Sequence, residues 1–425
     1  MSRVLIQNGR VIDPKNGLDK NADVYIADGK IAAIGEAPSG FSADEVIDAS
    51  GQIVSPGFVD LSVALREPGF EYKATIESET RAAVHAGVTT LCCPPDTRPV
   101  IDTPSVVESI QQRNEQAGYA RVVMIGALTR GMEGKQLSEI AALKAVGCVG
   151  VGNGVHAIKN ALVMRRAMEY ASSHDMTVFI HPMDPWLAAD GFAHEGAVAT
   201  RLGLNGIPEI AETIAVSRDL ALAELTGARV HFCRLSTAAA VRMLSRAGFD
   251  GLPVSGDVAA HQLHLVDVDM SSFDSNYHVI PPLRSQRDKE GLRAGLIDNV
   301  LSGICSDHQP HDIDAKVGPL GDTEPGISGL ASLLPLTLRL VEETNLSLSD
   351  ALGFITHKPA KVLGLNVGAI AVGDSADVCV FDPDACWMLN EDTMISRGKN
   401  SPYMNRELVG KVSHTLLEGR IVYRS

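Results

Sequence analysis

The sequence predicts an α/β protein, in which a (β/α)8 barrel of the TIM type carries a small β domain built from both ends of the chain. Three observations predict this fold. Eight short apolar segments in the middle of the chain alternate with segments of helical spacing. The apolar segments are nearly continuous, as parallel strands covered on both faces are. The two ends are instead rich in β-branched residues and turn signals.

The first 52 residues are expected to be all-β. β-Branched residues flank Asn8-Gly9 and Asp28-Gly29, and each pattern predicts a β-hairpin. The end of the chain has the same character, because 376–381 is strand-like and Glu418-Gly419 joins two further apolar segments. The two ends therefore predict a single β domain.

The predicted boundaries follow from this change of pattern. Residues 1–52 and 366–425 are expected to form a composite β-sandwich domain, and residues 53–365 the barrel. The eight predicted barrel strands are 58–63, 88–93, 122–128, 148–152, 177–181, 229–235, 252–258 and 303–306. The main predicted helices are 75–85, 105–117, 138–145, 161–172, 207–225 and 238–247, with 330–343 and 348–356 closing the barrel.

Composition excludes several classes of function. The chain of 425 residues carries a formal charge of -15 and has no basic run, which argues against binding to nucleic acid or to an anionic membrane. No apolar stretch approaches the ~20 residues that span a bilayer. The first turn comes too early for a signal peptide. We therefore expect a cytoplasmic protein without nucleic-acid or membrane partners.

The seven cysteines are expected to be reduced thiols. Most lie in apolar strand-like segments, and the sequence contains no Cys-x-x-Cys pair of the kind found in zinc ribbons and thioredoxin-like sites. Core packing therefore explains Cys92, Cys93 and Cys305 better than a nucleophilic role does.

In barrels of this type chemistry collects where the strands end. The polar and small residues at those positions are Ser62, Ala64, Arg66, Asp96, Asn153, His181, Arg234, Asp257, Asp307 and His308. This set includes carboxylates and histidines, but no group of three or four ligands of the kind that zinc requires.

The segment Asp60–Gly69 gives the strongest family signal. In form it resembles the Asp-x-His-x-His-x-Arg-x-Pro-Gly motif of the dihydroorotases, with Ser62 and Ala64 in place of the two histidines. The resemblance to this family of the amidohydrolase superfamily covers nearly the whole chain. Further matching segments are 8–14, 56–60, 71–73, 76–78, 194–196, 206–208, 281–284, 306–311 and 398–402.

The resemblance implies six metal-ligand positions. Besides Ser62 and Ala64, the position of the bridging carboxylate or modified lysine holds Asn153, and the histidine position after the sixth strand holds Arg234. The remaining two positions keep their ligands, as His181 and Asp307. Two ligands are too few for a hydrolytic metal site, which needs about three. Arg234 adds a fixed positive charge where the cation would lie, so we expect the zinc site to be lost and no cofactor to be bound.

Positions that the resemblance implies for substrate binding have also changed. Arg66 remains where relatives bind a substrate carboxylate, but Asp96 and Ile280 replace asparagines. An aspartate repels an anionic substrate, and an isoleucine offers it no hydrogen bond. Arg66 has two interpretations, a retained carboxylate clamp or an ion pair with a neighbouring acid.

Three further interpretations concern individual side chains. We expect Arg234 to form a buried ion pair with Asp307, with His181 beside it, because a buried charge needs a partner. His308 and His311 are candidate metal ligands outside the old site, although a polar loop is the preferred explanation. His194-Glu195 resembles a loop feature of the family.

Two functions remain. The first is a catalytically inactive dihydroorotase homologue that acts as a structural and assembly subunit. The resemblance to non-catalytic chains of bacterial pyrimidine synthesis implies the aspartate transcarbamoylase catalytic chain as its partner, in a mixed oligomer. The alternative is an active amidohydrolase, a dihydroorotase-like cyclic amide hydrolase, with a rebuilt or metal-free site that uses Asp307 and His181.

Overall fold

Eight parallel strands form the central sheet of the computed structural model, which describes residues 3–425. Each predicted barrel strand is confirmed, with ends that differ by a few residues. A parallel bridge between Val63 and His308 joins the first and last strands, so the sheet closes. In chain order the strands are β8 (Phe58–Asp60), β9 (Val88–Cys93), β10 (Arg121–Ala127), β11 (Gly150–Gly152), β12 (Thr177–Ile180), β15 (Val230–Phe232), β16 (Val254–Ala259) and β17 (Gly303–Cys305).

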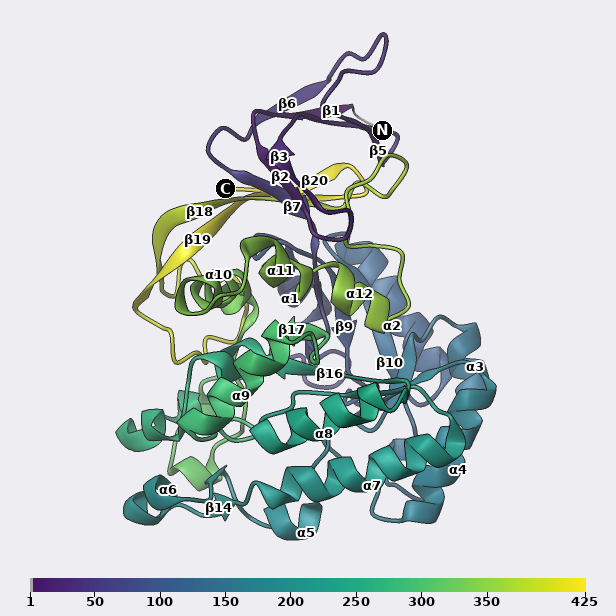
Figure 1. Cartoon of the computed structure of the whole chain (residues 1–425), viewed down its shortest axis with the longest axis vertical. Helices are drawn as coiled ribbons and strands as arrows, with labels where there is room; N and C mark the ends of the chain where they lie inside the picture. Colours follow the sequence, from purple (N-terminus) through teal and green to yellow (C-terminus); the bar gives the residue numbers. More distant parts are fainter. Residues whose placement is uncertain (1–2) are drawn as a thin grey trace.

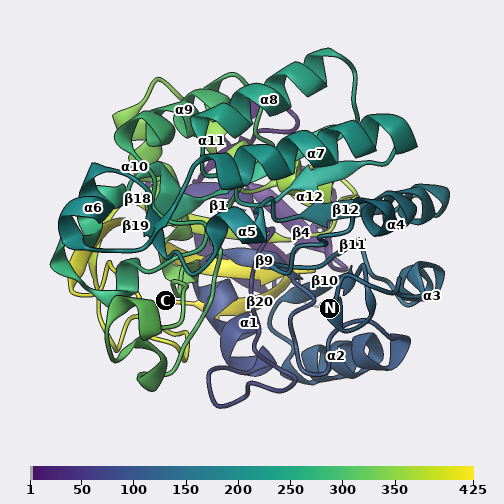
Figure 2. The ribbon, with the colours of Figure 1, turned by 90° about the horizontal axis from the view of Figure 1, so that it is seen from below.

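Helices surround this sheet, as the view from below shows (Figure 2). They are α1 (Ile76–His85), α2 (Pro104–Ala117), α3 (Ile140–Ala145), α4 (Ala161–Ser173), α5 (Pro185–Ala188), α6 (Ala197–Leu202), α7 (Ile210–Thr226), α8 (Ala238–Phe249), α9 (Gln286–Ile297), α10 (Leu333–Glu343), α11 (Leu348–Gly353) and α12 (His357–Val362). Short 3-10 helices are η1 (Arg130–Met132), η2 (Ala260–Leu263), η3 (Asp267–Ser272), η4 (Ser275–Tyr277), η5 (Asp314–Lys316), η6 (Leu320–Asp322) and η7 (Leu330–Ser332).

Helix α9 was not expected from the sequence, which is polar there and holds two glycines in the helix interior. Both glycines have a packing role against α8. A Cβ added at Gly291 would lie 2.3 Å from the Cβ of Ala238, and one at Gly295 would lie 2.7 Å from Val241 Cγ1. The glycines therefore let two barrel helices approach closely, which offsets their low helix propensity.

The two ends of the chain meet in one β domain, visible as purple and yellow strands at the top of Figure 1. One sheet has the order β5-β4-β1-β6 and the other β20-β19-β18-β7-β2-β3. The strands are β1 (Val4–Gln7), β2 (Arg10–Asp13), β3 (Leu18–Asn21), β4 (Val24–Ala27), β5 (Lys30–Ile34), β6 (Glu45–Asp48), β7 (Ile53–Pro56), β18 (Val378–Leu389), β19 (Arg406–Leu417) and β20 (Arg420–Arg424). Strand β7 belongs to this domain's sheet, although we expected the barrel to begin at residue 53.

One of the two predicted N-terminal hairpins is wrong. β4 and β5 do pair antiparallel around Asp28-Gly29, but β1 and β2 lie in different sheets. At Asn8-Gly9 the chain crosses between the sheets, and a Cβ on Gly9 would lie 2.5 Å from Val54 Cγ2. The crossing lets Ile12 pack in the barrel core while Val11 packs inside the β domain. Burial of both faces of β2 thus outweighs the local turn signal.

The interior of the barrel has a core separate from the layer between strands and helices. It contains Val59, Cys92, Phe179 and Cys305, and α12 adds Ala360 at one end. A two-stranded parallel ladder of β13 (Ala193–His194) and β14 (Gly206–Ile207) lies in the loop after β12. Side chains therefore fill the barrel interior below the carboxyl ends of the strands, where the active sites of such barrels lie.

All seven cysteines are free thiols. Cys92, Cys93, Cys148 and Cys305 are buried as expected, whereas Cys233 is only partly buried. No helix within residues 3–425 combines the length and the apolar character that crossing a membrane requires.

Candidate functional site

The structure brings four of the predicted site residues together at the carboxyl ends of the barrel strands. Ser62 follows β8, His181 follows β12, Arg234 follows β15 and Asp307 follows β17. Because parallel strands end at the same edge of the sheet, these residues meet although they are far apart in sequence.

Arg234 and Asp307 form the expected ion pair. The Nη1 atom of Arg234 lies 2.7 Å from Oδ1 of Asp307, and both side chains are buried. Gln309 Nε2 donates to the same oxygen at 3.0 Å, and Ser62 Oγ donates to it at 3.3 Å. Arg234 and Asp307 both have left-handed backbone conformations, with φ of 55° and 46°. Such conformations are unfavourable for residues with a Cβ and are held here by the surrounding contacts.

The pair is ionised. Burial alone would raise the pKa of Asp307, but the charges of Arg234 and His261 and the hydrogen bonds from Arg234 and Gln309 hold it below its usual value. Burial alone would lower the pKa of Arg234, but the carboxylate of Asp307 holds it above its usual value. A carboxylate fixed in this way is a weak general base.

His181 lies beside the pair without bonding to it. Burial and the charge of Arg234 lower the pKa of His181 to about 3. Among residues 3–425, neither of its ring nitrogens has a hydrogen-bond partner. The expected participation of His181 in the ion pair is therefore limited to proximity, and its imidazole is neutral at physiological pH.

Asn153 is directed at a loop. Its Oδ1 accepts from the backbone N–H of Thr129 at 3.0 Å, and its Nδ2 donates to Thr129 Oγ1 at 2.8 Å and approaches Met132 O at 3.4 Å. Ala64 is buried. Both positions serve packing and loop geometry.

The space left between these residues is small. A cavity of about 30 Å³ remains, bordered by Ser62, His181, Arg234 and Asp257 among others. That volume holds roughly one or two water molecules.

Among residues 3–425, Arg66 does not form the expected ion pair with a neighbouring acid, and its interpretation as a clamp for a substrate carboxylate stays a prediction. Its Nε donates to the carbonyl of Pro310 at 3.0 Å, and its Nη2 lies 3.2 Å from Nε2 of His311. No carboxylate within the described residues pairs with it. Lys73 approaches the other ring nitrogen of His311 at 3.2 Å. Burial and the charges of Arg66 and Lys73 lower the pKa of His311 to about 2.

His308 and His311 face different partners. His308 Nε2 lies 2.7 Å from Oε2 of Glu79, and both side chains are fully buried. The two histidines thus do not face a common site. Both lie in the loop after β17, as the preferred explanation holds, but their side chains are buried. Their polar atoms are satisfied by carboxylate, lysine and arginine groups from distant parts of the chain.

The remaining predicted positions are partly exposed or structural. Asp96 is partly exposed. Ile280 packs against an apolar cluster that includes Met183 and Ile207. His194 lies 3.3 Å from the guanidinium of the buried Arg284, which donates to the carbonyl of Ile207 at 2.7 Å.

Known proteins resemble this chain over its whole length. A dihydro-orotase-like family model matches residues 51–240, and an amidohydrolase family model matches residues 328–423. A dihydroorotase-like protein of Pseudomonas aeruginosa is 49% identical over 420 residues, which are 99% of each chain. The chain belongs to the dihydroorotase-like family. A dihydroorotase of Syntrophotalea carbinolica is 43% identical over 422 residues, again 99% of each chain.

A solved structure confirms the fold. The match to an L-hydantoinase (dihydropyrimidinase) from Arthrobacter aurescens covers 100% of this chain and 96% of the hydantoinase chain, with a TM-score of 0.87 and 23% sequence identity. The predicted family and the predicted barrel with an extra β domain are therefore both confirmed.

The residues at the six family positions do not fit a zinc ion. Only His181 and Asp307 offer ligand atoms of the usual kind, and Asp307 is already bonded to a guanidinium. Asn153 is bonded to the Thr129 loop. A metal bound between His181 and Asp307 would have to displace the charge of Arg234.

A different group of potential ligands was missed by the sequence analysis. Ligand atoms of His231, Cys233 and Asp257 lie within 4.8 Å of one another. Both nitrogens of His231 already have partners at 2.8 Å, namely Asp257 Oδ2 and Ser255 Oγ. Residues 231 and 255 are paired across β15 and β16, a register that the sequence does not reveal. In this dihydroorotase-like protein both ring nitrogens of His231 are therefore already used in hydrogen bonds.

Glu212 was also missed. This fully buried carboxylate on α7 accepts hydrogen bonds from the backbone N–H and the hydroxyl of both Ser236 and Thr237. It therefore positions the start of α8 directly after Arg234. Its place on a long helix carries no local sequence signal for this role.

Proposed function

We propose that this dihydroorotase-like protein is catalytically inactive and acts as a structural and assembly subunit of an aspartate transcarbamoylase complex in pyrimidine synthesis. The observation that carries the proposal is the ion pair between Arg234 and Asp307, two residues at positions where the family resemblance implies metal ligands. The partner rests on the family resemblance. The complex would be cytoplasmic.

Loss of hydrolysis follows from the chemistry of the site. A hydrolytic zinc lowers the pKa of its bound water to ~7 and needs about three protein ligands with one open position. This site offers two ligands, one of them occupied, together with a permanent cation. A zinc ion would meet strong repulsion in so poorly solvated a place. We therefore propose that the protein holds no zinc at these positions.

A metal-free hydrolase is the weaker candidate. It would need a general base near pH 7, but Asp307 has its pKa held below the usual value and His181 has its pKa lowered to about 3. The remaining cavity of about 30 Å³ would also have to open before a cyclic amide could enter.

The retained fold supports an assembly role. The barrel, the composite domain and the hydrogen bonds that buried Glu212 accepts from the start of α8 are all present, whereas four of the six implied metal-ligand positions hold other residues. Selection on a surface, rather than on a reaction, would preserve a sequence in this way. A closed barrel presents a rigid surface to a partner chain.

The first experiment tests inactivity. Purified protein is measured for bound metal and for turnover of dihydroorotate, beside an active dihydroorotase as the positive control. We expect no stoichiometric zinc and no turnover. Zinc at one ion per chain together with turnover would refute the proposal.

The second experiment tests the partner. The aspartate transcarbamoylase catalytic chain from the same organism is expressed with and without this protein, and its oligomeric mass and activity are measured. We expect a mixed complex and higher activity or stability when both chains are present. Identical mass and activity in the two preparations would exclude the assembly role while leaving inactivity standing.

A further inference from the structure

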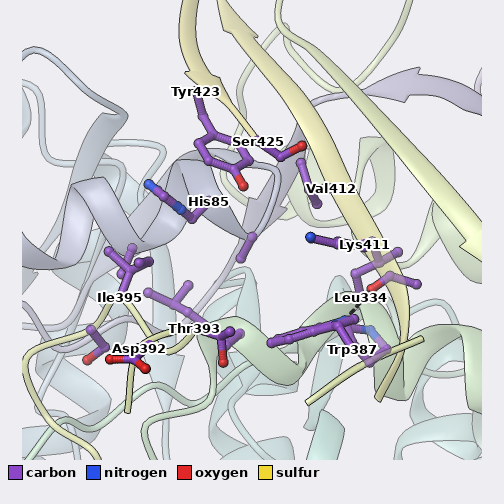
Figure 3. Close-up of a pocket in the computed structure, with 17 residues that line it drawn as sticks. His85, Leu334, Trp387, Asp392, Thr393, Ile395, Lys411, Val412, Tyr423 and Ser425 are labelled. Carbon is purple, nitrogen blue, oxygen red and sulfur yellow. Dashed lines mark hydrogen bonds between the residues drawn. The ribbon is translucent and has the colours of Figure 1, made fainter. Parts of the chain in front are cut away.

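A pocket of about 330 Å³ lies where the barrel meets the C-terminal strands (Figure 3). None of its lining residues borders the cavity beside Arg234. Helices α1 and α10 and the 3-10 helix η7 form one side, and strands β18, β19 and β20 form the other. Its volume falls within the range of ligand pockets. It is also about ten times the volume of the cavity beside Arg234.

Two aromatic side chains line opposite parts of this junction pocket, and both are held in place. The indole Nε1 of Trp387 donates to the carbonyl of Gly410 at 2.9 Å. The ring of Tyr423 lies against the ring of His85, with centroids 3.9 Å apart and an interplanar angle of 36°. Leu334 and other apolar side chains complete the walls. Fixed aromatic walls favour a flat ligand, because little conformational entropy is lost on binding.

Two polar groups border the pocket without partners among the described residues: the exposed Lys411 and the half-buried Tyr423. In Figure 3 the ammonium of Lys411 and the hydroxyl of Tyr423 are both directed into the space. Within residues 3–425 neither group makes a hydrogen bond or an ion pair. His85 adds no charge at neutral pH, since burial and the charge of Arg81 lower its pKa to about 4. Asp392 lies at the far edge of the pocket and is exposed.

We propose that this junction pocket binds a small aromatic carboxylic acid. The ring of the acid lies between Trp387 and Tyr423, and its carboxylate accepts hydrogen bonds from Lys411 and from the Tyr423 hydroxyl. A cation and a neutral donor beside aromatic walls suit an aromatic anion better than a neutral or cationic ring. The inference does not depend on whether the barrel site is active.

Binding at this place contacts both domains at once. Tyr423 and Trp387 come from the strands of the C-terminal segment, whereas His85 and Leu334 come from barrel helices. A ligand that bridges them stabilises the folded protein in proportion to its occupancy.

The test uses dansylglycine, a fluorescent aromatic carboxylate. The chain has two tryptophans, and Trp186 is 76% exposed on a distant helix. Trp186→Phe therefore leaves Trp387 as the sole energy donor. We expect saturable dansyl emission when this tryptophan is excited, and a rise in the thermal unfolding temperature with dansylglycine concentration.

Three variants in the Trp186→Phe background locate the binding. Ala331→Phe fills the pocket from its partly exposed rim without adding a second tryptophan, and should abolish the energy transfer. Lys411→Met should weaken dansylglycine binding about fivefold, as expected for an exposed ion pair, and should not weaken binding of neutral dansylamide. Lys135→Met, at an exposed lysine elsewhere, should have no effect.

Three results would overturn the proposal. Absence of saturable energy transfer overturns the proposal, as does equal binding by Ala331→Phe protein with an unchanged circular dichroism spectrum. Equal affinity for dansylglycine in the Lys411→Met and Lys135→Met proteins would show that the ligand is not recognised as an acid, and would also overturn it.

Discussion

The guanidinium of Arg234, after β15, bonds to the carboxylate of Asp307, after β17, across the end of the intervening strand β16. Both residues lie where the family resemblance implies metal ligands. Under the proposed function, the guanidinium of Arg234 takes the place of a bound metal ion. The carboxylate of Asp307 then has a positive partner, and the proposal implies that no open coordination position remains for hydrolysis.

Breaking this pair should destabilise the protein. Asp307→Asn keeps the side-chain shape but leaves the charge of Arg234 buried without a counter-ion, so we expect a loss of about 3–5 kcal/mol in unfolding free energy, measured by urea denaturation. The matched control is Asp175→Asn at the exposed pair with Arg229, which should cost less than ~1 kcal/mol.

The double variant Arg234→Met/Asp307→Leu sharpens this prediction. Since removal of both charges leaves no buried charge without a counter-ion, the double variant should lose less stability than Asp307→Asn, apart from the hydrogen bonds of Ser62 and Gln309 to residue 307. Equal losses in the single and the double variants would mean that packing, and not charge, explains the effect.

His181 should make the protein sensitive to acid. Its pKa is about 3 in the folded state against 6.5 in the unfolded state, so below pH 6.5 the unfolded chain binds more protons and stability falls as the pH falls. Between pH 7 and pH 5 this group should account for about 2 kcal/mol. His181→Leu should reduce the loss by that amount in denaturation curves at the two pH values.

The control for acid sensitivity is His156→Gln, at an exposed histidine. It should leave the pH dependence unchanged. A His181→Leu protein that loses stability as steeply as the natural one would contradict the assignment of this sensitivity to residue 181.

Restoring ligands should restore metal binding. In Ser62→His/Ala64→His/Arg234→His protein, three new imidazoles join His181 and Asp307, which exceeds the about three ligands that zinc needs. We expect retained zinc by elemental analysis after gel filtration. Ser62→His/Ala64→His protein, which keeps Arg234, should retain far less because the guanidinium repels the ion. Equal zinc in the two variants would remove the role given to Arg234.

Arg121 should hold the barrel to the β domain. Its Nη1 lies 2.6 Å from Oδ2 of the buried Asp377, and its Nη2 lies 2.9 Å from Glu418. Arg121→Met should cost about 2 kcal/mol in unfolding free energy, because a buried carboxylate loses its charged donor. Lys135→Met should change stability by less than ~0.5 kcal/mol. Matching thermal scans of the two variants would show that this contact contributes nothing.

Much of the fold could be predicted because the barrel strands are continuous apolar segments separated by helical ones. What escaped prediction depended on long-range packing. Helix α9 contains Gly291 and Gly295, and glycines inside a segment argue against a helix. Only the tertiary structure shows that α8 packs closely against both of them. The Asn8-Gly9 pattern predicts a hairpin from local residues alone. The chain instead crosses between the sheets, because the two faces of β2 pack into different cores.

The sequence by itself determined the family and the barrel. The family resemblance further implies that four ligand positions are replaced, because residue identity alone decides whether a side chain can bind a metal. The sequence also indicated the partner of Arg234, since a buried charge needs a counter-ion. The tertiary structure decided how the residues at these positions are bonded: within residues 3–425 His181 makes no side-chain hydrogen bond, Asn153 bonds to the Thr129 loop, and Arg66 contacts His311. The junction pocket likewise exists only in the folded chain, because Trp387, Tyr423 and His85 meet through β-sheet register and helix packing.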